Sequence, residues 1–510
     1  MSFQFLLSNA NLKRRFETYL FCFYLALGLG GILNHAMWRD ELNGWLIVRD
    51  SADWGALWRS LRYEGHPILW YLCLWLLEKG TNNPLAMQIF HWGLGAAATG
   101  LFIFKAPFSR WEKALFALGY LPLYEYFLIS RNYALGYLAL MGFCVVFPRR
   151  RYGVLALLLG IMANSNAYAL LISLALAGVL GVEAYQNRLR GVKPWAFWGA
   201  VALYSGAVAL AVWMLLPPGD SVLQGGASQW FWQLDLYRFN QSLSRVWNSY
   251  VLVLVPSDAQ AWAVAIFSAL SALILAFWAL YFADYPLVLL FYLLASGLIL
   301  LFTYLKFLGS ARHYGHLYLI LISALWLRRD DHPRFSLTQK IPRLAALKTW
   351  AEKTAPRFLI LILVLQLVSG WIAFGRDLTL PYSASRETAR YLQRQALSHL
   401  DLIGSEDFAV SPISAYLNRQ IYYPESRRWG SYVLFNQSRQ PVSDAEILAQ
   451  IEAGLGTQFT APVILVLNHP LQEDRDSLQI EPLQEITRSF IGNEQYYLYR
   501  IAPARSGIRN

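Results

Sequence analysis

Long apolar runs recur through most of this chain and limit what it can fold into. About 20 consecutive apolar residues are enough to cross a bilayer as a helix. Of the 510 residues, 56% are hydrophobic and only 15% are charged, whereas about a quarter are charged in a typical water-soluble domain. We therefore predict an α-helical polytopic membrane protein with about eleven transmembrane helices. The runs that approach a spanning length are residues 16–37, 85–104, 113–129, 133–147, 152–163, 167–184, 195–216, 261–281, 286–304, 314–327 and 358–375.

The placement of basic residues favours a membrane protein over a nucleic-acid-binding one. The net charge is +11, but the Lys and Arg residues lie in clusters between apolar runs, as they do in the loops of membrane proteins. We expect no nucleic-acid partner. The three cysteines all lie in apolar stretches, so they indicate neither a disulfide framework nor a metal site.

The same basic clusters predict the orientation. The short apolar segment 67–77 reads better as a helix in the outer interface than as a span. The clusters at 13–15, 105–113, 149–151 and 328–357 then all face one side, which is the cytoplasmic side of the cell (inner or plasma) membrane. The N-terminus is thus expected in the cytoplasm and the C-terminus outside it.

The composition becomes more polar after the last apolar run and indicates two domains. Residues 1–376 are expected to form the transmembrane domain, with outer loops at 38–84 and 217–260. Residues 377–510 are expected to form a soluble extracytoplasmic α/β domain, because helix-like and strand-like patterns alternate there. The expected helices are 385–400 and 443–455, and the expected strands are 421–423, 461–469 and 495–502.

Two acidic clusters border the first outer loop. Asp40 and Glu41 occur in "MWRDELNGW", and Glu64 and His66 occur in "YEGHPILWY". Neighbouring residues on a helix face different ways, so one carboxylate of the first pair should face an outer cavity while the other pairs with Arg39 or caps a helix. These groups suit general-base work on a hydroxyl. The alternative is an interfacial charge pair in water.

Cations lie at the outer ends of two other expected spans. Arg131 precedes the run 133–147, and Lys306, Arg312 and His313 precede the run 314–327. Cations that converge from two helices suit an anionic group such as a lipid phosphate. The alternative for an arginine in this position is contact with lipid headgroups.

The order of these motifs carries a family resemblance. "RDE", "EGHPILWY", "SRNYAL" and "SARHYGHLYL" follow one another as in the GT-C superfamily of polytopic glycosyltransferases, and the chain is similar to protein O-mannosyltransferases and lipid A aminoarabinose transferases over roughly residues 16–375. The resemblance implies transfer of a sugar from a polyprenyl-phosphate donor on the outer face of the membrane. It also implies a catalytic role for the acidic motif, which falls on Asp40 and Glu41.

The remaining motifs match with two departures. The family's His-Pro-Pro-Leu element falls on residues 66–69, where Ile68 replaces the second proline. Its Arg-x-Tyr element falls on Arg131 and Tyr133. A late Arg-Tyr element falls on residues 312–314, where His313 is inserted between the two residues.

The sequence thus predicts an inverting glycosyltransferase. Asp40, with Glu41 second, is the expected base, and the lipid-linked donor, membrane lipids and a lipid, glycan or protein acceptor are the expected partners. The sequence identifies no certain cofactor. The alternative is a divalent cation, Mg²⁺ or Mn²⁺, on Asp40, Glu64 and His66. A flippase or transporter of lipid-linked sugars and a non-catalytic scaffold are the rival functions. The expected substrate-binding residues are Glu64, His66, Arg131, Tyr133, Lys306, Arg312 and His313.

Overall fold

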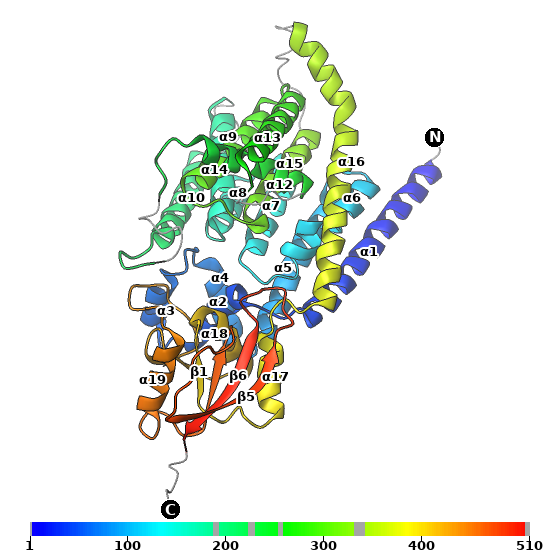
Figure 1. Cartoon of the computed structure of the whole chain (residues 1–510). Helices are drawn as coiled ribbons and strands as arrows, with labels where there is room; N and C mark the ends of the chain where they lie inside the picture. The colour runs from blue at the N-terminus through cyan, green and yellow to red at the C-terminus, as the bar shows by residue number, and fades with distance from the viewer. Residues whose placement is uncertain (1–2, 187–192, 223–229, 253–258, 331–341, 505–510) are drawn as a thin grey trace, which may run out of the picture.

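Helices form most of the computed structural model, which describes residues 3–186, 193–222, 230–252, 259–330 and 342–504 (Figure 1). A helical bundle occupies one end of the molecule and a smaller sheet domain the other. In chain order the helices before the sheet domain are α1 (Phe3–Asn34), α2 (Arg39–Asp50), α3 (Trp54–Leu61), α4 (Leu69–Glu78), α5 (Leu85–Lys105), α6 (Arg110–Ala117), η1 (Leu121–Glu125), α7 (Tyr133–Val146), η2 (Phe147–Arg149), α8 (Tyr152–Ala163), α9 (Ala167–Gln186), α10 (Pro194–Leu215), α11 (Leu236–Leu243), α12 (Arg245–Val251), α13 (Ala261–Tyr281), α14 (Pro286–Leu305), α15 (Ala311–Asp330) and α16 (Pro342–Thr379).

Seven of these helices are long and apolar enough to cross a membrane. They correspond to seven of the eleven expected spans and lie in α1, α5, α9, α10, α13, α14 and α16. Helices α7 and α8 are apolar but shorter, with 14 and 12 residues. The expected run 113–129 is divided between α6 and the π-helical turn η1, whose second residue is Pro122. The missing N–H of a proline interrupts a helix, so the run 113–129 does not form one continuous helix. The eleven-span count therefore remains a prediction.

Some of the long helices expose apolar surface that water would not favour. In the most apolar 18-residue window of α10 only 17% of the residues are buried, and in that of α13 only 28%. Leu203 on α10 and Leu273 on α13 are each at least half exposed. Because soluble proteins seldom expose large contiguous apolar patches, this surface suggests a membrane protein.

The first expected outer loop is folded rather than extended. Helices α2, α3 and α4 lie where the bundle meets the sheet domain (Figure 1). Trp45, Leu46 and Ile47 of α2 are fully buried, in a cluster that also includes Ala415 of the sheet domain. Helix α4 has ten residues, too few to cross a bilayer, in agreement with the expectation that the segment 67–77 is not a span; its position in the interface stays a prediction.

The second expected outer loop also contains helical structure. Its helix α12 packs into the bundle, where Val246 and Tyr250 are fully buried in the main core. The Gln366 side-chain amide of α16 donates a hydrogen bond of 2.8 Å to the backbone oxygen of Ser249. Part of the segment 217–260 is therefore a structural element of the bundle.

The C-terminal domain is a three-layer α/β structure. Its helices are α17 (Ser385–Arg394), α18 (Asp407–Leu417) and α19 (Asp444–Gly454), and its strands are β1 (Leu402–Gly404), β2 (Ile421–Tyr423), β3 (Arg428–Gly430), β4 (Val463–Leu467), β5 (Leu478–Ile486) and β6 (Tyr496–Pro503). The sheet order is β3-β2-β1-β4-β6-β5, and β1 runs parallel to both β2 and β4. Successive residues of β4 pack alternately on α19 and on the α17/α18 side, which explains its uninterrupted apolar sequence.

The expected elements of this domain are partly confirmed. Helix α19 and strands β2, β4 and β6 lie where the patterns placed them, and α17 begins at the expected residue but ends at Arg394 rather than at residue 400. The patterns did not identify α18, β1, β3 or β5. Helix α16 continues to Thr379, so the sheet domain begins a few residues after the expected boundary at 376.

Specific polar contacts attach the sheet domain to the bundle. The Arg386 guanidinium of α17 donates to the backbone oxygens of Leu33, Asn34 and His35 at the end of α1. The Arg49 guanidinium of α2 donates to the Asn418 side-chain oxygen at 3.1 Å. The domain is therefore joined to α1 and α2 as well as to the end of α16.

Candidate functional site

A group of arginines surrounds Asp40 at the junction of the two domains. The Asp40 Oδ2 atom lies 2.7 Å from Arg312 Nη2 and 3.0 Å from Arg131 Nη1, and its Oδ1 atom lies 3.9 Å from Arg39 Nε. The Asp40 side chain is 26% exposed. The structure thus brings together one carboxylate and three guanidinium groups from α2, the segment before α7, and α15, as the sequence predicted for Asp40, Arg131 and Arg312.

Local chain geometry explains how Arg131 and Arg312 reach this carboxylate. Arg131 precedes α7, where its Nη1 atom also donates to the Asp40 backbone oxygen at 2.6 Å. Arg312 is the second residue of α15, just after Gly309, which has φ of 73°. A Cβ atom on Gly309 would lie only 2.9 Å from the His313 Cβ atom. Glycine is therefore required for the tight turn that starts α15.

The charge balance keeps Asp40 ionised. Burial raises the pKa of Asp40, but the charges of Arg131, Arg312 and Arg39 together lower it by more than burial raises it. The pKa of Asp40 therefore lies below its usual value.

Two further carboxyl groups act on these arginines, Glu64 on Arg131 and Glu494 on Arg39, but burial raises the pKa of each to about 7, so they are only partly ionised at neutral pH. Three guanidinium groups therefore face fewer than three full negative charges, and the site has an excess of positive charge. That excess attracts anions.

His66 lies against Arg131. Its Nε2 atom is 2.9 Å from Arg131 Nη2. Burial lowers the pKa of His66 to about 3, and the charge of Arg131 adds to this effect. The imidazole is therefore neutral at pH 7 and accepts the hydrogen bond from Arg131 through Nε2.

Glu64 is the second carboxyl group of the site. Its Oε1 atom accepts a hydrogen bond from Asn43 Nδ2 at 2.7 Å, and its Oε2 atom accepts one from the Tyr71 hydroxyl at 3.1 Å. Burial raises the pKa of Glu64 to about 7, although Arg131, Tyr71 and Asn43 act in the opposite direction. Glu64 can therefore exchange a proton near neutral pH.

Glu41 faces away from Asp40, as expected for adjacent helical residues. Its side chain has no exposed surface. Its Oε1 atom accepts the Ser130 N–H at 2.6 Å, and its Oε2 atom accepts the Trp38 N–H at 3.3 Å near the start of α2. Glu41 thus links α2 to the segment that carries Arg131.

A buried histidine completes the surroundings of Glu41. His35 Nε2 lies 2.9 Å from Glu41 Oε2, and His35 Nδ1 lies 2.8 Å from Asp377 Oδ2. Because both ring nitrogens face a carboxylate oxygen, both can donate only when the imidazole is protonated. His35 and Asp377 were not among the predicted site residues; in the sequence, the only signal for either was a polar residue at the end of an apolar run.

The other predicted binding residues are placed differently. Tyr133 and His313 are buried, with ring centroids 5.7 Å apart, and the His313 Nδ1 atom accepts the Ser310 N–H at 2.9 Å. Lys306 follows α14, and its ammonium lies 4.7 Å from the ring centroid of Trp230. The Arg131 guanidinium carbon lies 6.0 Å from the ring centroid of Tyr133. Tyr133 and His313 therefore pack next to the arginines, whereas Lys306 lies on an aromatic side chain.

The cation alternative gains no support from the arrangement of ligands. Among the described residues, no group of three or more His, Cys, Asp and Glu side chains is arranged to hold a metal ion. The Arg131 guanidinium lies between two of the proposed ligands, with one nitrogen at His66 and another at Asp40. A fixed positive charge in this position opposes a divalent cation.

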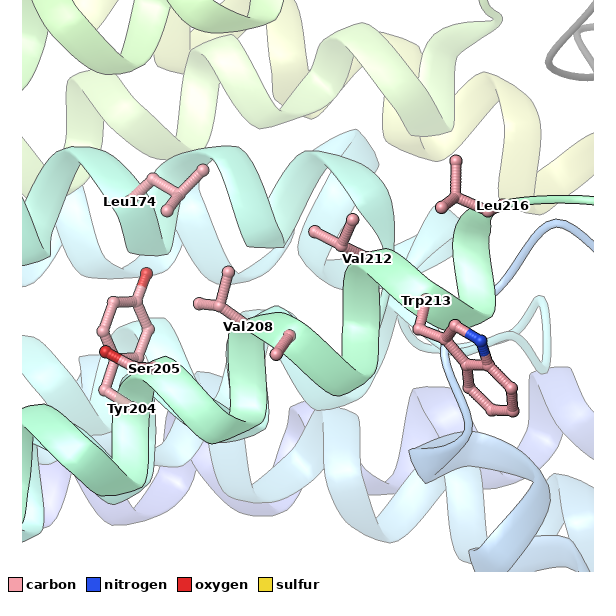
Figure 2. Close-up of a pocket in the computed structure, with 8 residues that line it drawn as sticks. Leu174, Tyr204, Ser205, Val208, Val212, Trp213 and Leu216 are labelled. Atoms are coloured by element: carbon pink, nitrogen blue, oxygen red, sulfur yellow. The ribbon is translucent and has the colours of Figure 1, made fainter.

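Two apolar hollows lie elsewhere in the bundle. One, of about 470 Å³, is lined by Leu174 of α9 and by α10 side chains such as Val208 and Val212 (Figure 2). The other, of about 640 Å³, lies between α11 and α14. Their linings do not include the Asp40 group, and their mainly apolar character suits lipid chains better than the chemistry of charged groups.

The sheet domain contributes directly to the Asp40 group. Arg39 donates from Nη1 to the Asn493 side-chain oxygen at 2.7 Å, and the same nitrogen lies 3.5 Å from Glu494 Oε1. Burial raises the pKa of Glu494 to about 7. Arg39 therefore connects Asp40 with a carboxyl group that lies more than 450 residues away in the sequence, which the sequence analysis did not anticipate.

A functional proposal for this protein depends on the geometry of the residues around Asp40. The chain matches no family model, no curated protein and no solved structure.

Proposed function

We propose that this protein is an inverting glycosyltransferase of the GT-C type, which moves a sugar from a polyprenyl-phosphate donor to an acceptor at the outer face of the membrane. The observation that carries this proposal is the convergence of Arg39, Arg131 and Arg312 on Asp40. Two of the arginines come from separate elements of the bundle, and the side chains are partly exposed. The donor phosphate is the anion that this excess of positive charge would bind.

Donor binding would change the partners of Asp40. A phosphate group competes with the Asp40 carboxylate for Arg131 and Arg312, since guanidinium groups bind both anions through paired charge-assisted hydrogen bonds. When the phosphate takes these donors, the Asp40 carboxylate loses the contacts that lower its pKa. It then becomes a stronger base at the point where the sugar is bound.

The transfer step follows from this exchange. Asp40 takes the proton of an acceptor hydroxyl or amine, and the acceptor atom attacks the anomeric carbon of the sugar. The bond between that carbon and the phosphate oxygen breaks, and the electron pair stays on the phosphate, whose added negative charge Arg131 and Arg312 stabilise. A single displacement inverts the anomeric configuration.

Neighbouring residues would support this step without touching the leaving group. Glu64 and His66 lie on the other side of Arg131 and would orient the acceptor. Glu41 would act as a positioning residue, because it binds the Ser130 N–H next to Arg131. Lys306 would bind the lipid headgroup region.

The proposal includes a membrane arrangement with eleven spans, a cytoplasmic N-terminus and an extracytoplasmic sheet domain. The grouping of basic residues between the apolar helices supports it. A topology reporter fused after Asn510 should report the outer compartment, and one at Arg150 the cytoplasm. Detection of both reporters on the same side would contradict this arrangement.

The enzymatic proposal is tested with purified protein in lipid nanodiscs and a panel of polyprenyl-phosphate sugars. Mass spectrometry should detect sugar on an acceptor and an equal amount of released polyprenyl phosphate. Comparison of cell-surface glycans with and without the protein identifies the acceptor class. Movement of intact donor across a vesicle bilayer, without release of polyprenyl phosphate, would instead identify a flippase.

A further inference from the structure

One face of α2 belongs to the sheet domain and another to the bundle. Arg39, Asn43 and Asp50 are four and seven residues apart, so they lie along one side of the helix. Each contacts the sheet domain: Arg39 binds Asn493 and Glu494, Asn43 binds Val433, and Asp50 accepts a hydrogen bond from Ser431. Asp40, next to Arg39, faces the bundle arginines.

Asn43 makes the contact that matters most for the chemistry of the site. The Val433 N–H donates to Asn43 Oδ1 at 3.0 Å, and Asn43 Nδ2 lies 3.4 Å from the Val433 backbone oxygen. The same Nδ2 atom donates to Glu64 Oε1 at 2.7 Å. The amide therefore bridges a backbone group of the sheet domain and a carboxyl group of the outer loop.

The Val433 backbone selects which end of the Asn43 amide faces Glu64. Only with Oδ1 toward the Val433 N–H and Nδ2 toward its carbonyl oxygen are both backbone groups satisfied. Rotation of the amide by half a turn would direct its oxygen at the Glu64 carboxylate, where two acceptors repel each other. Docking of the sheet domain thus fixes a hydrogen-bond donor on Glu64.

The Glu64 carboxyl group has neighbours with opposite effects on its protonation. Besides Asn43, Glu64 is surrounded by the Tyr71 hydroxyl, the Arg131 guanidinium and the Asp40 carboxylate. Burial and Asp40 favour its neutral form, whereas Arg131, Tyr71 and Asn43 favour its ionised form. Removal of one donor from this balance shifts it toward the neutral form.

We propose that Asn43 is a positioning residue through which the docked sheet domain holds a hydrogen bond on Glu64 and adjusts how readily that carboxyl group accepts a proton. The proposal rests on the proposed glycosyl transfer for its catalytic consequence only. The hydrogen bond itself is measurable without substrate.

The direct test is a pH titration of the full-length protein in nanodiscs by infrared difference spectroscopy. The band of the protonated Glu64 carboxyl group is assigned by its loss in Glu64→Gln. In the wild-type protein its midpoint should lie near pH 7. In Asn43→Leu, which keeps the size but has no donor, the midpoint should rise by about one pH unit.

A backbone variant separates this role from general packing. Val433→Pro lacks the N–H that orients the Asn43 amide, so its Glu64 midpoint should also rise. Val433→Ala keeps the N–H, and Gln437→Ala changes an exposed side chain in the same segment; both should leave the midpoint unchanged. An unchanged midpoint in both Asn43→Leu and Val433→Pro would overturn the proposal.

The catalytic consequence is read from the pH profile of transfer. In the proposed mechanism Glu64 orients the acceptor by accepting a hydrogen bond from its hydroxyl, which the ionised carboxylate does best. In Asn43→Leu the acid limb of kcat should therefore move to higher pH by the same amount as the infrared midpoint. Lack of transfer from every donor tested would contradict the proposed function, while the spectroscopic midpoint would still decide the role of Asn43. A shifted infrared midpoint with an unshifted kcat profile would overturn the catalytic part of this proposal.

Discussion

The two ends of the helical bundle differ in how their buried and partly buried cations are paired with carboxylates. At the end away from the sheet domain, buried and partly buried cations are matched with carboxylates in close pairs: Lys113–Glu17 at 2.6 Å, Arg150–Glu183 at 2.6 Å and Arg329–Glu112 at 2.8 Å. At the junction with the sheet domain, one carboxylate lies within 4 Å of three arginines.

This difference separates packing from binding. A matched ion pair leaves little net charge and mainly fastens helices to one another, whereas an excess of cations has unused capacity for an anion. The opposite end also has exposed basic residues such as Arg14 and Arg151, but only at the junction do partly buried arginines from separate elements converge on one point among the described residues. The junction is therefore the place where the proposed donor phosphate would bind. Variants of the two ends should therefore differ in their effects, most of all at Asp40.

The largest effect is expected at Asp40. Asp40→Asn keeps the shape of the side chain but removes the base, so transfer should fall by about 10²–10⁴-fold. Glu183→Gln, at the opposite end, should transfer sugar at the wild-type rate once the amount of folded protein is matched. Rates are measured by release of polyprenyl phosphate, and a normal rate in Asp40→Asn would exclude Asp40 as the base.

Glu41 should affect stability more than chemistry. Loss of one partner from a buried ion pair costs about 3–5 kcal/mol, and Glu41 is fully buried against His35 and the Ser130 N–H. Glu41→Gln should therefore lower the free energy of unfolding, while the folded fraction retains more activity than Asp40→Asn. If Glu41→Gln is stable but inactive and Asp40→Asn is active, the two roles are reversed.

The arginines should determine donor affinity. Loss of a charge-assisted hydrogen bond costs about 1.5–3 kcal/mol, so Arg131→Ala and Arg312→Ala should each bind the donor roughly ten- to a hundredfold more weakly. Arg150→Ala removes a cation from the opposite end and should leave donor affinity unchanged. Wild-type affinity in both junction variants would instead indicate that these arginines serve the fold or the lipid headgroups.

The smallest effect concerns the pH dependence of stability. Burial raises the pKa of Glu494 from 4.5 to about 7, so between these values the folded protein binds a proton that the unfolded chain has lost. This contribution to stability is present at low pH and is lost as the pH rises through 7. The unfolding temperature of Glu494→Gln should fall less between pH 5 and pH 8 than that of the wild type. An equal fall in both proteins would exclude Glu494 as a source of the pH dependence, and Glu485→Gln, at an exposed position, is the control.

Much of the fold followed from local patterns, and what was missed depended on long-range contacts. The apolar runs predicted the long helices, and the alternating patterns predicted β4 and α19. Strand β1 has only three residues, too few for a recognisable pattern. Helix α18 contains Pro412, which obscured it.

The site was also predictable only where local sequence patterns revealed its residues. Asp40, Arg131 and Arg312 lie together, and the distribution of basic loops predicted that all three would be on the same side of the membrane. The contact between His35 and Asp377 joins residues 342 positions apart, and no local pattern encodes it. The participation of Glu494 and Val433 depends on how the sheet domain docks, which composition and periodicity do not reveal.

The central claim is that a phosphate and the Asp40 carboxylate compete for the same arginines. The most direct measurement is the affinity of nanodisc-embedded wild type and Asp40→Asn for one polyprenyl-phosphate sugar, at the same pH and salt concentration. The account predicts that Asp40→Asn binds this donor more tightly than the wild type, because the competing carboxylate is gone, and yet does not transfer the sugar. Weaker donor binding in Asp40→Asn than in the wild type would contradict it.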